Sequence, residues 1–402
     1  MAIRDDFPFI VKHPKVAYFD SAATMLKPQS VVEAVVDYYE NLSSNIHRGD
    51  YKYAYETGVR YEAVRDKIAN FLNVKRDRVV FTSGASESLN LIAQGYGLHN
   101  LKKGDVILIN EAEHASNTLP WFALKESLGI EVEFIKLNHE GRLTVDALKD
   151  ALHDNVKLVS LAHVTNVLGF ENDIKAIANL VHESGALLCV DGAQSVGHMP
   201  VDLEDLDADF FAFSAHKMLG PTGVGVMVAK SELLEIMQPL NTGGGNNVRY
   251  NACGDVVLKK APAKFESGTP NIEGVLGFGA AIDYLNSIGM ENIHKIIEPL
   301  HKRLVEGLMA LDHVELYNPN ADLGIASFSV KGIFAQDVAA YLNSFDICTR
   351  SGEHCAKMLN GALHSEKSVR LSLYVYNTIE EVEKFLDVIA SITLEKTINL
   401  YI

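Results

Sequence analysis

Two side chains, Lys217 and Cys355, have sequence surroundings that suit covalent chemistry. Lys217 follows the apolar run DFFAFS and precedes a turn rich in glycine and proline, in the segment SAHKMLGPTGVG. Lysine is ordinarily a surface amine, but these apolar flanks favour a desolvated amine, which can form a Schiff base with a carbonyl compound. Cys355 has the polar neighbours Glu353, His354 and Lys357. They argue against the inert buried thiol that is the commonest state of a cysteine.

Further candidate residues follow predicted strands, because ligands of open α/β sheets bind beyond the carboxyl ends of the strands. Asp191 ends the run LLCVD, where its carboxylate could pair with a protonated ring nitrogen of a cofactor or cap the next turn. His114 in EAEHASN could stack on an aromatic ring, and Asn166 in HVTNVLG could donate to a ring oxygen. Taken singly, each is more often a satisfied histidine or a turn asparagine.

The segment FTSGASESLN turns directly from a predicted strand into a predicted helix. Backbone N–H groups and the Ser86 hydroxyl at such a turn suit a phosphate group. The local sequence by itself favours an ordinary serine cap of the helix over a phosphate site.

The elements that position these residues are predicted from hydrophobic patterning. Seven short apolar runs alternate with helix-like segments between residues 78 and 230: RVVFT, DVILIN, EVEFIKL, KLVSLAHV, ALLCVD, DFFAFS and GVGVMVA. Fully apolar runs are typical of strands whose sheet is covered by helices on both faces. Between them, Glu87–Gly95 and Ile174–Ser184 carry apolar residues at three-to-four spacing. The fold class is therefore predicted to be α/β with a mostly parallel sheet.

We predict two domains. The large domain covers residues 16–289, and the smaller C-terminal α+β domain covers residues 290–402 together with residues 1–15. A long helical pattern, Gly274–Ile288, ends the large domain. The smaller domain is expected to hold helices at Ile293–Leu311, Gln336–Leu342 and Glu380–Ser391 and strands at Gly324–Val330 and Val369–Leu373.

The bulk composition restricts the class of protein. With 402 residues, of which 48% are hydrophobic and 22% charged, the chain is long enough for two cores. Four irregularly spaced cysteines predict no disulfide framework and no metal site, and they favour a reducing, cytoplasmic compartment. The acidic N-terminal segment does not resemble a signal peptide, and no apolar run reaches the ~20 residues that span a bilayer. A formal net charge of -16 argues against nucleic-acid binding.

These residues together resemble one known family, the fold-type I pyridoxal-phosphate enzymes of the class V aminotransferase superfamily. Within it, the order and spacing of the motifs are similar to those of cysteine desulfurases, in the group that includes Suf-type enzymes and selenocysteine lyases. The motifs are YFDSAAT, NIHRGDY, SGASESLN, HVTNVLG, VDGAQS, SAHKMLGPTGVG, FESGTPN and RSGEHCA. The resemblance extends from about Tyr18 to Val388, and its most specific parts are the segments around Lys217 and Cys355.

The resemblance implies pyridoxal 5'-phosphate as the cofactor and a role for each matching residue. Lys217 would carry the cofactor as a Schiff base, Asp191 would keep its ring nitrogen protonated, and His114 would stack on the ring. The remaining cofactor contacts would come from Ala85, Ser86, Gln194, Ser214 and His216 at the phosphate, Asn166 at the ring hydroxyl, and Thr269 from the second subunit of a homodimer. The substrate would be bound by Arg370 at its carboxylate, with Arg350, Asn166 and His47 also in contact.

The activity that the resemblance implies is conversion of L-cysteine to L-alanine, with Lys217 removing the Cα proton and Cys355 becoming a persulfide. A sulfur-acceptor or scaffold protein would receive the sulfur for iron-sulfur cluster or related assembly. The alternatives are a selenocysteine lyase acting on L-selenocysteine, or another class V aminotransferase or lyase reaction. A catalytically silent scaffold is disfavoured because Lys217, Asp191, Arg370 and Cys355 occur together.

The chain departs from the family pattern at Glu353, where Suf-type enzymes often carry a histidine, and at Ala85, where a hydroxyl residue often helps to bind phosphate. Positive charge from Arg350, His354 and Lys357 is expected to favour the Cys355 thiolate. Glu353 is expected to oppose it.

Overall fold

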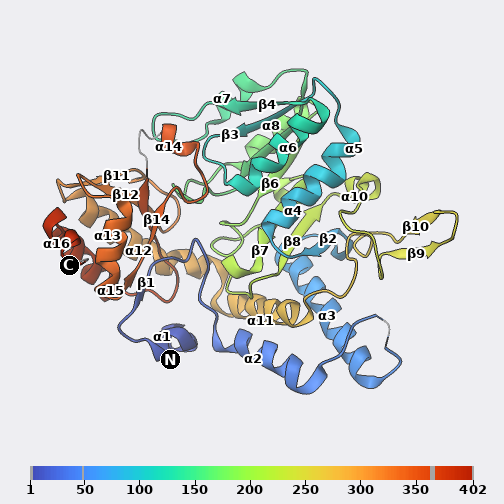
Figure 1. The fold of residues 1–402 in the computed structure, drawn as a ribbon, viewed down its shortest axis with the longest axis horizontal. Coiled ribbons are helices and arrows are strands. Elements are labelled where there is room, and N and C mark those ends of the chain that lie inside the picture. Colours follow the sequence, from blue (N-terminus) through green and yellow to red (C-terminus); the bar gives the residue numbers. More distant parts are fainter. Residues whose placement is uncertain (1–2, 48, 363–366, 401–402) are drawn as a thin grey trace.

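A seven-stranded sheet forms the centre of the larger part of the molecule. The computed structural model describes residues 3–47, 49–362 and 367–400 (Figure 1). The sheet has the order β2 (Val79–Thr82), β8 (Gly225–Ala229), β7 (Phe210–Ser214), β6 (Leu187–Asp191), β5 (Val156–Ala162), β3 (Val106–Asn110) and β4 (Glu131–Ile135). Strand β8 runs antiparallel to both of its neighbours, and the remaining pairs are parallel. All seven predicted strands and the mostly parallel α/β fold are confirmed.

Helices cover both faces of this sheet. Alternate residues of a strand point to opposite faces, so each strand can pack against helices on both sides. In β8, Val226 and Val228 pack in one apolar cluster with residues of α3 (Lys52–Phe71), α8 (Ile174–Glu183) and α11 (Ile272–Ile288). Met227 and Ala229 pack in another cluster with α4 (Ala85–Leu91), α6 (Leu119–Leu128) and α10 (Ser231–Ile236). Burial on both faces explains why the strands read as continuous apolar runs.

The predicted helices of the larger part are confirmed, with small changes of boundary. The buried residues of α8 lie on one face, at Ile174, Ile177, Ala178 and Val181, and Asp173 caps its start. The helical pattern at Glu87–Gly95 corresponds to α4 continued by a π-helical stretch, Ile92–Gly97. The other helices before residue 230 are α1 (Pro8–Lys12), α2 (Gln29–Asp37), α5 (Leu98–Asn100), α7 (Val145–Ala151) and α9 (Leu203–Leu206).

A second, four-stranded antiparallel sheet organises the C-terminal part of the chain. Its order is β11 (Val314–Leu316), β12 (Ile325–Val330), β15 (Ser368–Ser372) and β14 (Arg350–Gly352). Its helices are α12 (Met290–Met309), α13 (Ala335–Asn343), α14 (Leu359–Ala362), α15 (Ile379–Ala390) and α16 (Leu394–Ile398). The predicted helices and strands of this region are confirmed, and a capping box between Thr378 and Glu381 begins α15.

The N-terminal segment joins the C-terminal part of the fold. Strand β1 (Ala17–Tyr18) pairs in parallel with β13 (Ile347–Cys348), and Asp20 bridges to Ser372. The division at residues 16 and 289 stays a prediction, but this pairing places residues 17–20 beside the elements assigned to the smaller domain. The segment that follows then reaches the large sheet, because the Met25 N–H donates to the His216 carbonyl at 2.9 Å.

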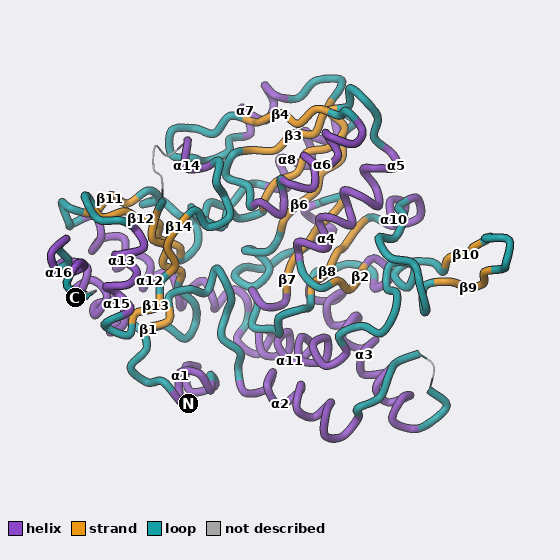
Figure 2. Tube along the Cα trace, viewed as in Figure 1, coloured by secondary structure: helices purple, strands orange, loops and turns teal. Residues whose placement is uncertain are grey.

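A hairpin on the surface is among the elements that were not predicted. Strands β9 (Asn247–Tyr250) and β10 (Val256–Leu258) form an antiparallel hairpin that projects from the body of the molecule (Figures 1 and 2). Within residues 3–47, 49–362 and 367–400, no helix has the length and apolar character needed to cross a membrane.

Candidate active site

A cavity of about 550 Å³ lies where strands β5, β6 and β7 end and meets the C-terminal sheet of the fold. It brings together eleven of the fourteen residues predicted for the site, from segments far apart in the sequence. They are Ala85, Ser86, His114, Asn166, Asp191, Ser214, His216, Lys217, Arg350, Cys355 and Arg370. The predicted amine and thiol therefore line the same cavity.

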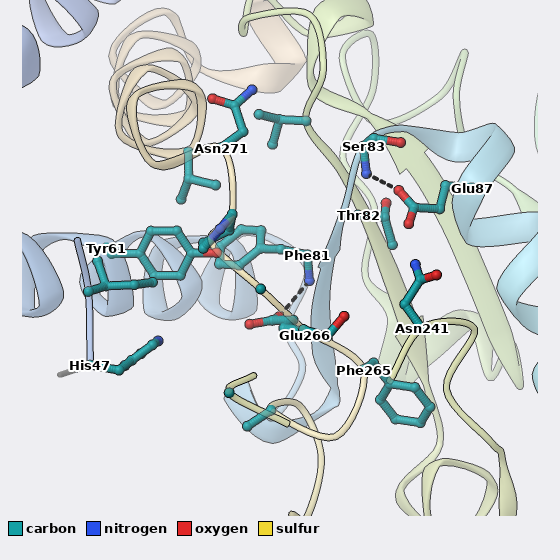
Figure 3. Close-up of a pocket in the computed structure, with 18 of the residues that line it drawn as sticks. His47, Tyr61, Phe81, Thr82, Ser83, Glu87, Asn241, Phe265, Glu266 and Asn271 are labelled. Atoms are coloured by element: carbon teal, nitrogen blue, oxygen red, sulfur yellow. Dashed lines mark hydrogen bonds between the residues drawn. The ribbon is translucent and has the colours of Figure 1, made fainter. Parts of the chain in front are cut away.

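The other three predicted residues do not line this cavity. Gln194 is buried behind it, with its Nε2 donating to the Ala22 carbonyl at 2.9 Å and its Oε1 without a hydrogen-bond partner. Thr269 is exposed and accepts a hydrogen bond from Asn45 Nδ2 at 3.1 Å. His47 borders a different cavity, of about 530 Å³, with Tyr61 and Glu266 (Figure 3).

Lys217 occupies the centre of the candidate site, in the short 3-10 turn Ala215–Lys217 that follows β7. Burial lowers the pKa of its amine, Asp191 opposes that shift, and the Arg370 guanidinium adds to it. A lowered pKa enlarges the neutral fraction of the amine, which is the form that attacks a carbonyl carbon or removes a proton. Asp191 is itself buried, and its Oδ1 accepts from the Ala193 N–H at 3.0 Å.

His114 presents a neutral ring to the cavity. Burial and the nearby Lys217 lower its pKa, and its Nδ1 accepts a hydrogen bond from the Ser116 N–H at 3.1 Å. The proton of the neutral ring is therefore on Nε2. A neutral, fixed imidazole can stack on a ring that carries positive charge without the repulsion that a second cation would cause.

Glu113 holds the turn that carries His114, and sequence reasoning did not identify it. Its two carboxyl oxygens accept from Asn110 Nδ2 at 2.8 Å and from Asn117 Nδ2 at 2.7 Å, and burial raises its pKa to about 8. The only sequence feature that could have pointed to Glu113 is that it is a second glutamate, two residues after Glu111, in INEAEH.

Three hydroxyl groups gather at the start of α4. The Ala85 N–H donates to Ser214 Oγ at 2.7 Å, and Ser86 Oγ shares a hydrogen bond with Ser116 Oγ at 2.6 Å. Ser116, like the predicted residues, lines the cavity. The backbone approaches closely here, since a Cβ atom added to Gly225 would lie 2.3 Å from the Gly84 Cα.

The loop that carries Cys355 is fixed on the large sheet. The Ala115 N–H donates to the Cys355 carbonyl at 2.7 Å, and Asn166 Nδ2 donates to the His354 carbonyl at 2.8 Å. An apolar cluster adds a third anchor through Ala356, Leu359, Ala112, Val167, Leu168 and Phe170. His354 and Cys355 both have left-handed backbone angles, with φ of 49° and 58°, which non-glycine residues rarely adopt. These anchors keep the exposed Cys355 at the cavity.

The charges around Cys355 differ from the sequence prediction. Burial and the Arg370 guanidinium lower the pKa of His354 to about 3, so this ring is neutral at pH 7, and the expectation that it adds positive charge is wrong. Its Nε2 lies 3.0 Å from Ser368 Oγ. Lys357 Nζ lies 3.5 Å from Glu353 Oε2, so the carboxylate partly offsets that cation.

Arg370 is the buried cation of the site, with 2% of its surface exposed. Its Nη1 donates to the Asn166 carbonyl at 2.8 Å, and its Nε has no hydrogen-bond partner. Asn166 Oδ1 is also buried without a partner. Buried polar atoms are rarely left unpaired, so these atoms around the cavity indicate a polar ligand.

Comparison with known proteins places this arrangement in a family. The sequence profile described as "Aminotransferase class-V" matches residues 17–385. The chain belongs to the aminotransferase class-V family. Within that family, it is 40% identical to a cysteine desulfurase of Haloferax volcanii, over 96% of this chain and 95% of that protein.

Two solved structures of the same kind are similar over almost the whole chain. The apo cysteine desulfurase of Thermococcus onnurineus is 40% identical with a TM-score of 0.93, covering 97% of this chain and 98% of the other. The Escherichia coli cysteine desulfurase CsdA is 33% identical with a TM-score of 0.91, covering 99% and 98%. The fold-type I architecture predicted from the motifs is therefore confirmed.

Proposed function

We propose that this chain is a pyridoxal-phosphate-dependent cysteine desulfurase, which takes the sulfur of L-cysteine as a persulfide on Cys355 and releases L-alanine. The observation that carries the proposal is the presence of Lys217, Arg370 and Cys355 in a single cavity. The names of the similar proteins support the same activity. The RSGEHCA segment further favours the Suf-type group.

The residues of the cavity fit the cofactor. Its volume lies in the range of small-molecule sites, and it combines a lysine of lowered pKa with buried, unpaired polar atoms. Lys217 would hold the cofactor covalently, Asp191 would face its ring nitrogen and His114 would cover its ring. The phosphate would lie by Ser86, Ser214 and His216, where burial lowers the His216 pKa to about 4 and keeps that ring neutral. When bound, the cofactor supplies an electron sink for bond changes at the substrate.

Each reacting part of L-cysteine has a partner in the chain. Arg370 would bind the carboxylate through its unpaired Nε and fix the amino acid in the cavity. The Lys217 amine would remove the Cα proton. The Cys355 thiolate would form a bond to the substrate sulfur while the carbon–sulfur bond breaks. The electron pair of that bond stays with the carbon, which takes a proton and becomes the methyl group of alanine.

Replacement of Arg370 by glutamine should raise the KM for L-cysteine about 10- to 100-fold, because a charge-assisted contact to the carboxylate is lost. Steady-state kinetics and calorimetric titration with L-alanine would measure this change. Arg303→Gln is the matched control, since Arg303 pairs with Glu383 on the surface at 2.6 Å. An Arg370→Gln enzyme with an unchanged KM and unchanged L-alanine affinity would exclude Arg370 as the carboxylate site.

We also propose that the active unit is a homodimer in which Thr269 of one chain completes the phosphate site of the other. Two facts support it: Thr269 is exposed and does not line the cavity of its own chain, and three tyrosine side chains are exposed at the start of α3. Tyr51, Tyr53 and Tyr55 are exposed by 56%, 52% and 74% of their surface at the start of α3. Tyrosine is enriched at protein interfaces relative to the rest of the surface.

Mixing two inactive chains should test the shared site. A Lys217→Ala chain supplies Thr269 to a Thr269→Val chain that retains Lys217, so random pairing should restore about a quarter of wild-type activity. Lys217→Ala mixed with Cys355→Ala should recover nothing, because both residues line the cavity of one chain. A fully active monomer in sedimentation, or recovery in the control mixture, would contradict the proposal.

Transfer of the persulfide to a sulfur-acceptor or scaffold protein for iron-sulfur cluster assembly is part of the same proposal. It is supported by Cys355, which is exposed at the cavity. We further propose a reducing, cytoplasmic location, which fits the four free cysteines, Cys189, Cys253, Cys348 and Cys355.

A further inference from the structure

Lys27 is a half-buried cation without a carboxylate to neutralise it. Its Nζ donates to three neutral oxygen atoms, which are the Met25 carbonyl, the His216 carbonyl at 3.3 Å and the Thr24 hydroxyl at 3.3 Å. Within the part of the chain that the structure describes, no carboxylate pairs with this amine, and burial lowers its pKa to about 8. Charges that are removed from water are ordinarily paired with an opposite charge, so an anion is missing near Lys27.

The Lys27 amine lies at the turn that carries two residues of the candidate site. His216, whose carbonyl it contacts, lines the cavity next to Lys217. Burial, the Lys217 amine and the Lys27 cation together lower the pKa of the His216 ring to about 4. The charge of Lys27 is therefore felt at a side chain of the cavity, although Lys27 does not line the cavity itself.

The cations that do line the cavity have other partners. Arg350 and Lys357 each have a carboxylate partner, at 2.9 Å and 3.5 Å. In the proposed function, Lys217 holds the cofactor covalently and Arg370 binds the substrate carboxylate. None of these four cations is left to offset a further anion in the cavity.

We propose that Lys27 supplies the positive charge that offsets the phosphate of the cofactor, and that it is in this sense a further residue of the cofactor site. This inference rests on the proposed function, in which the phosphate lies by Ser86, Ser214 and His216. Those partners are two hydroxyl groups and a neutral ring, whereas a phosphate ester carries about two negative charges at neutral pH. In a poorly solvated site, a cation attracts such an anion without direct contact.

The test compares pyridoxal 5'-phosphate with pyridoxal, which lacks the phosphate, in titrations of the full-length chain freed of cofactor. Lys27→Met should reduce the preference for pyridoxal 5'-phosphate over pyridoxal about three- to tenfold. Lys27→Arg, which keeps the charge, should retain the wild-type preference. Lys230→Met is the matched control and should also retain it, because Lys230 pairs with Asp207 at 2.6 Å and with Asp209 at 2.9 Å.

A purely structural role of Lys27 predicts a different result. If the amine only holds the backbone at His216, Lys27→Met weakens the binding of both ligands equally, and the preference keeps its wild-type value. That result would overturn the proposal, as would an equal loss of preference in Lys27→Arg or in Lys230→Met. Failure of the proposed phosphate site is a separate result: Ser86→Ala and Ser214→Ala would then keep the wild-type preference, whatever Lys27→Met does.

A measurement on the wild-type chain keeps the proposal testable where Lys27→Met does not fold. Coupling between two sites is reciprocal, so a phosphate whose binding the cation tightens three- to tenfold raises the pKa of the Lys27 amine by about 0.5 to 1. The pH midpoint of Lys27 acetylation, followed by mass spectrometry, should therefore be higher with pyridoxal 5'-phosphate bound than with pyridoxal bound. The neighbouring His216 ring stays neutral over this pH range and does not contribute. Equal midpoints for the two bound ligands would contradict the proposal.

Discussion

Replacing Lys217 by alanine should lower alanine formation from L-cysteine by about 10³- to 10⁴-fold or more, because the cofactor anchor and the base are lost together. The partly buried amine has a lowered pKa, which suits both roles at neutral pH. Borohydride reduction of the wild-type enzyme, followed by peptide mapping, should place the cofactor covalently on Lys217.

Lys264 provides a matched control for this expectation. As for Lys217, burial lowers the pKa of its amine, but the Lys264 Nζ donates to the carbonyls of Leu234 and Glu235, away from the cavity. Lys264→Met should therefore affect the thermal unfolding midpoint and leave the activity per folded molecule near the wild-type value. A reduced adduct on Lys264 or on Lys27, which lies near the His216 carbonyl, would show that the anchor is misassigned.

Cys355→Ala should separate substrate binding from sulfur transfer. The variant should still bind L-cysteine, because Lys217 and Arg370 are intact, but persulfide should be absent and alanine formation should fall on the order of 10³-fold. Calorimetric titration would measure binding, and mass spectrometry with alanine quantification would measure the chemistry.

Two of the three remaining cysteines, Cys253 and Cys348, are the controls for this variant. Cys253 is exposed at the β9–β10 hairpin, and Cys348 lies in β13, so neither lines the cavity. Cys253→Ala and Cys348→Ala should retain both persulfide and alanine. Undiminished alanine production by Cys355→Ala would refute the nucleophile assignment, even if the other two variants behaved as expected.

Most of the fold could be predicted because its strands are buried on both faces and its helices carry a regular apolar face. Strand β1 could not be found in this way, since its two residues pair with a strand more than 300 positions away. The β9–β10 hairpin was also missed, because its strands are largely exposed and the one apolar run in it, VVL in β10, is only three residues long.

The site residues that could be predicted are those whose type, and whose place directly after a predicted strand, suggest a chemical role. Asp20 is absent from that prediction because its ion pair with Arg350, whose Nη2 lies 2.9 Å from Asp20 Oδ2, brings together residues 330 positions apart, which sequence spacing does not reveal. The neutral state of His354 was missed for a related reason. Its flanking residues are polar, and only burial in the folded chain, together with the Arg370 guanidinium, lowers its pKa and removes its charge.

The most direct measurement adds L-cysteine labelled with ³⁵S to the purified holoenzyme, without an acceptor or reductant, and quantifies alanine and protein-bound sulfur in one sample. About one alanine should form per active chain, with an equal amount of label as a persulfide on the peptide that contains Cys355. Release of the label as sulfide without alanine, or its appearance on a peptide that contains another cysteine, would contradict the proposal that Cys355 takes sulfur from a substrate held by Lys217 and Arg370.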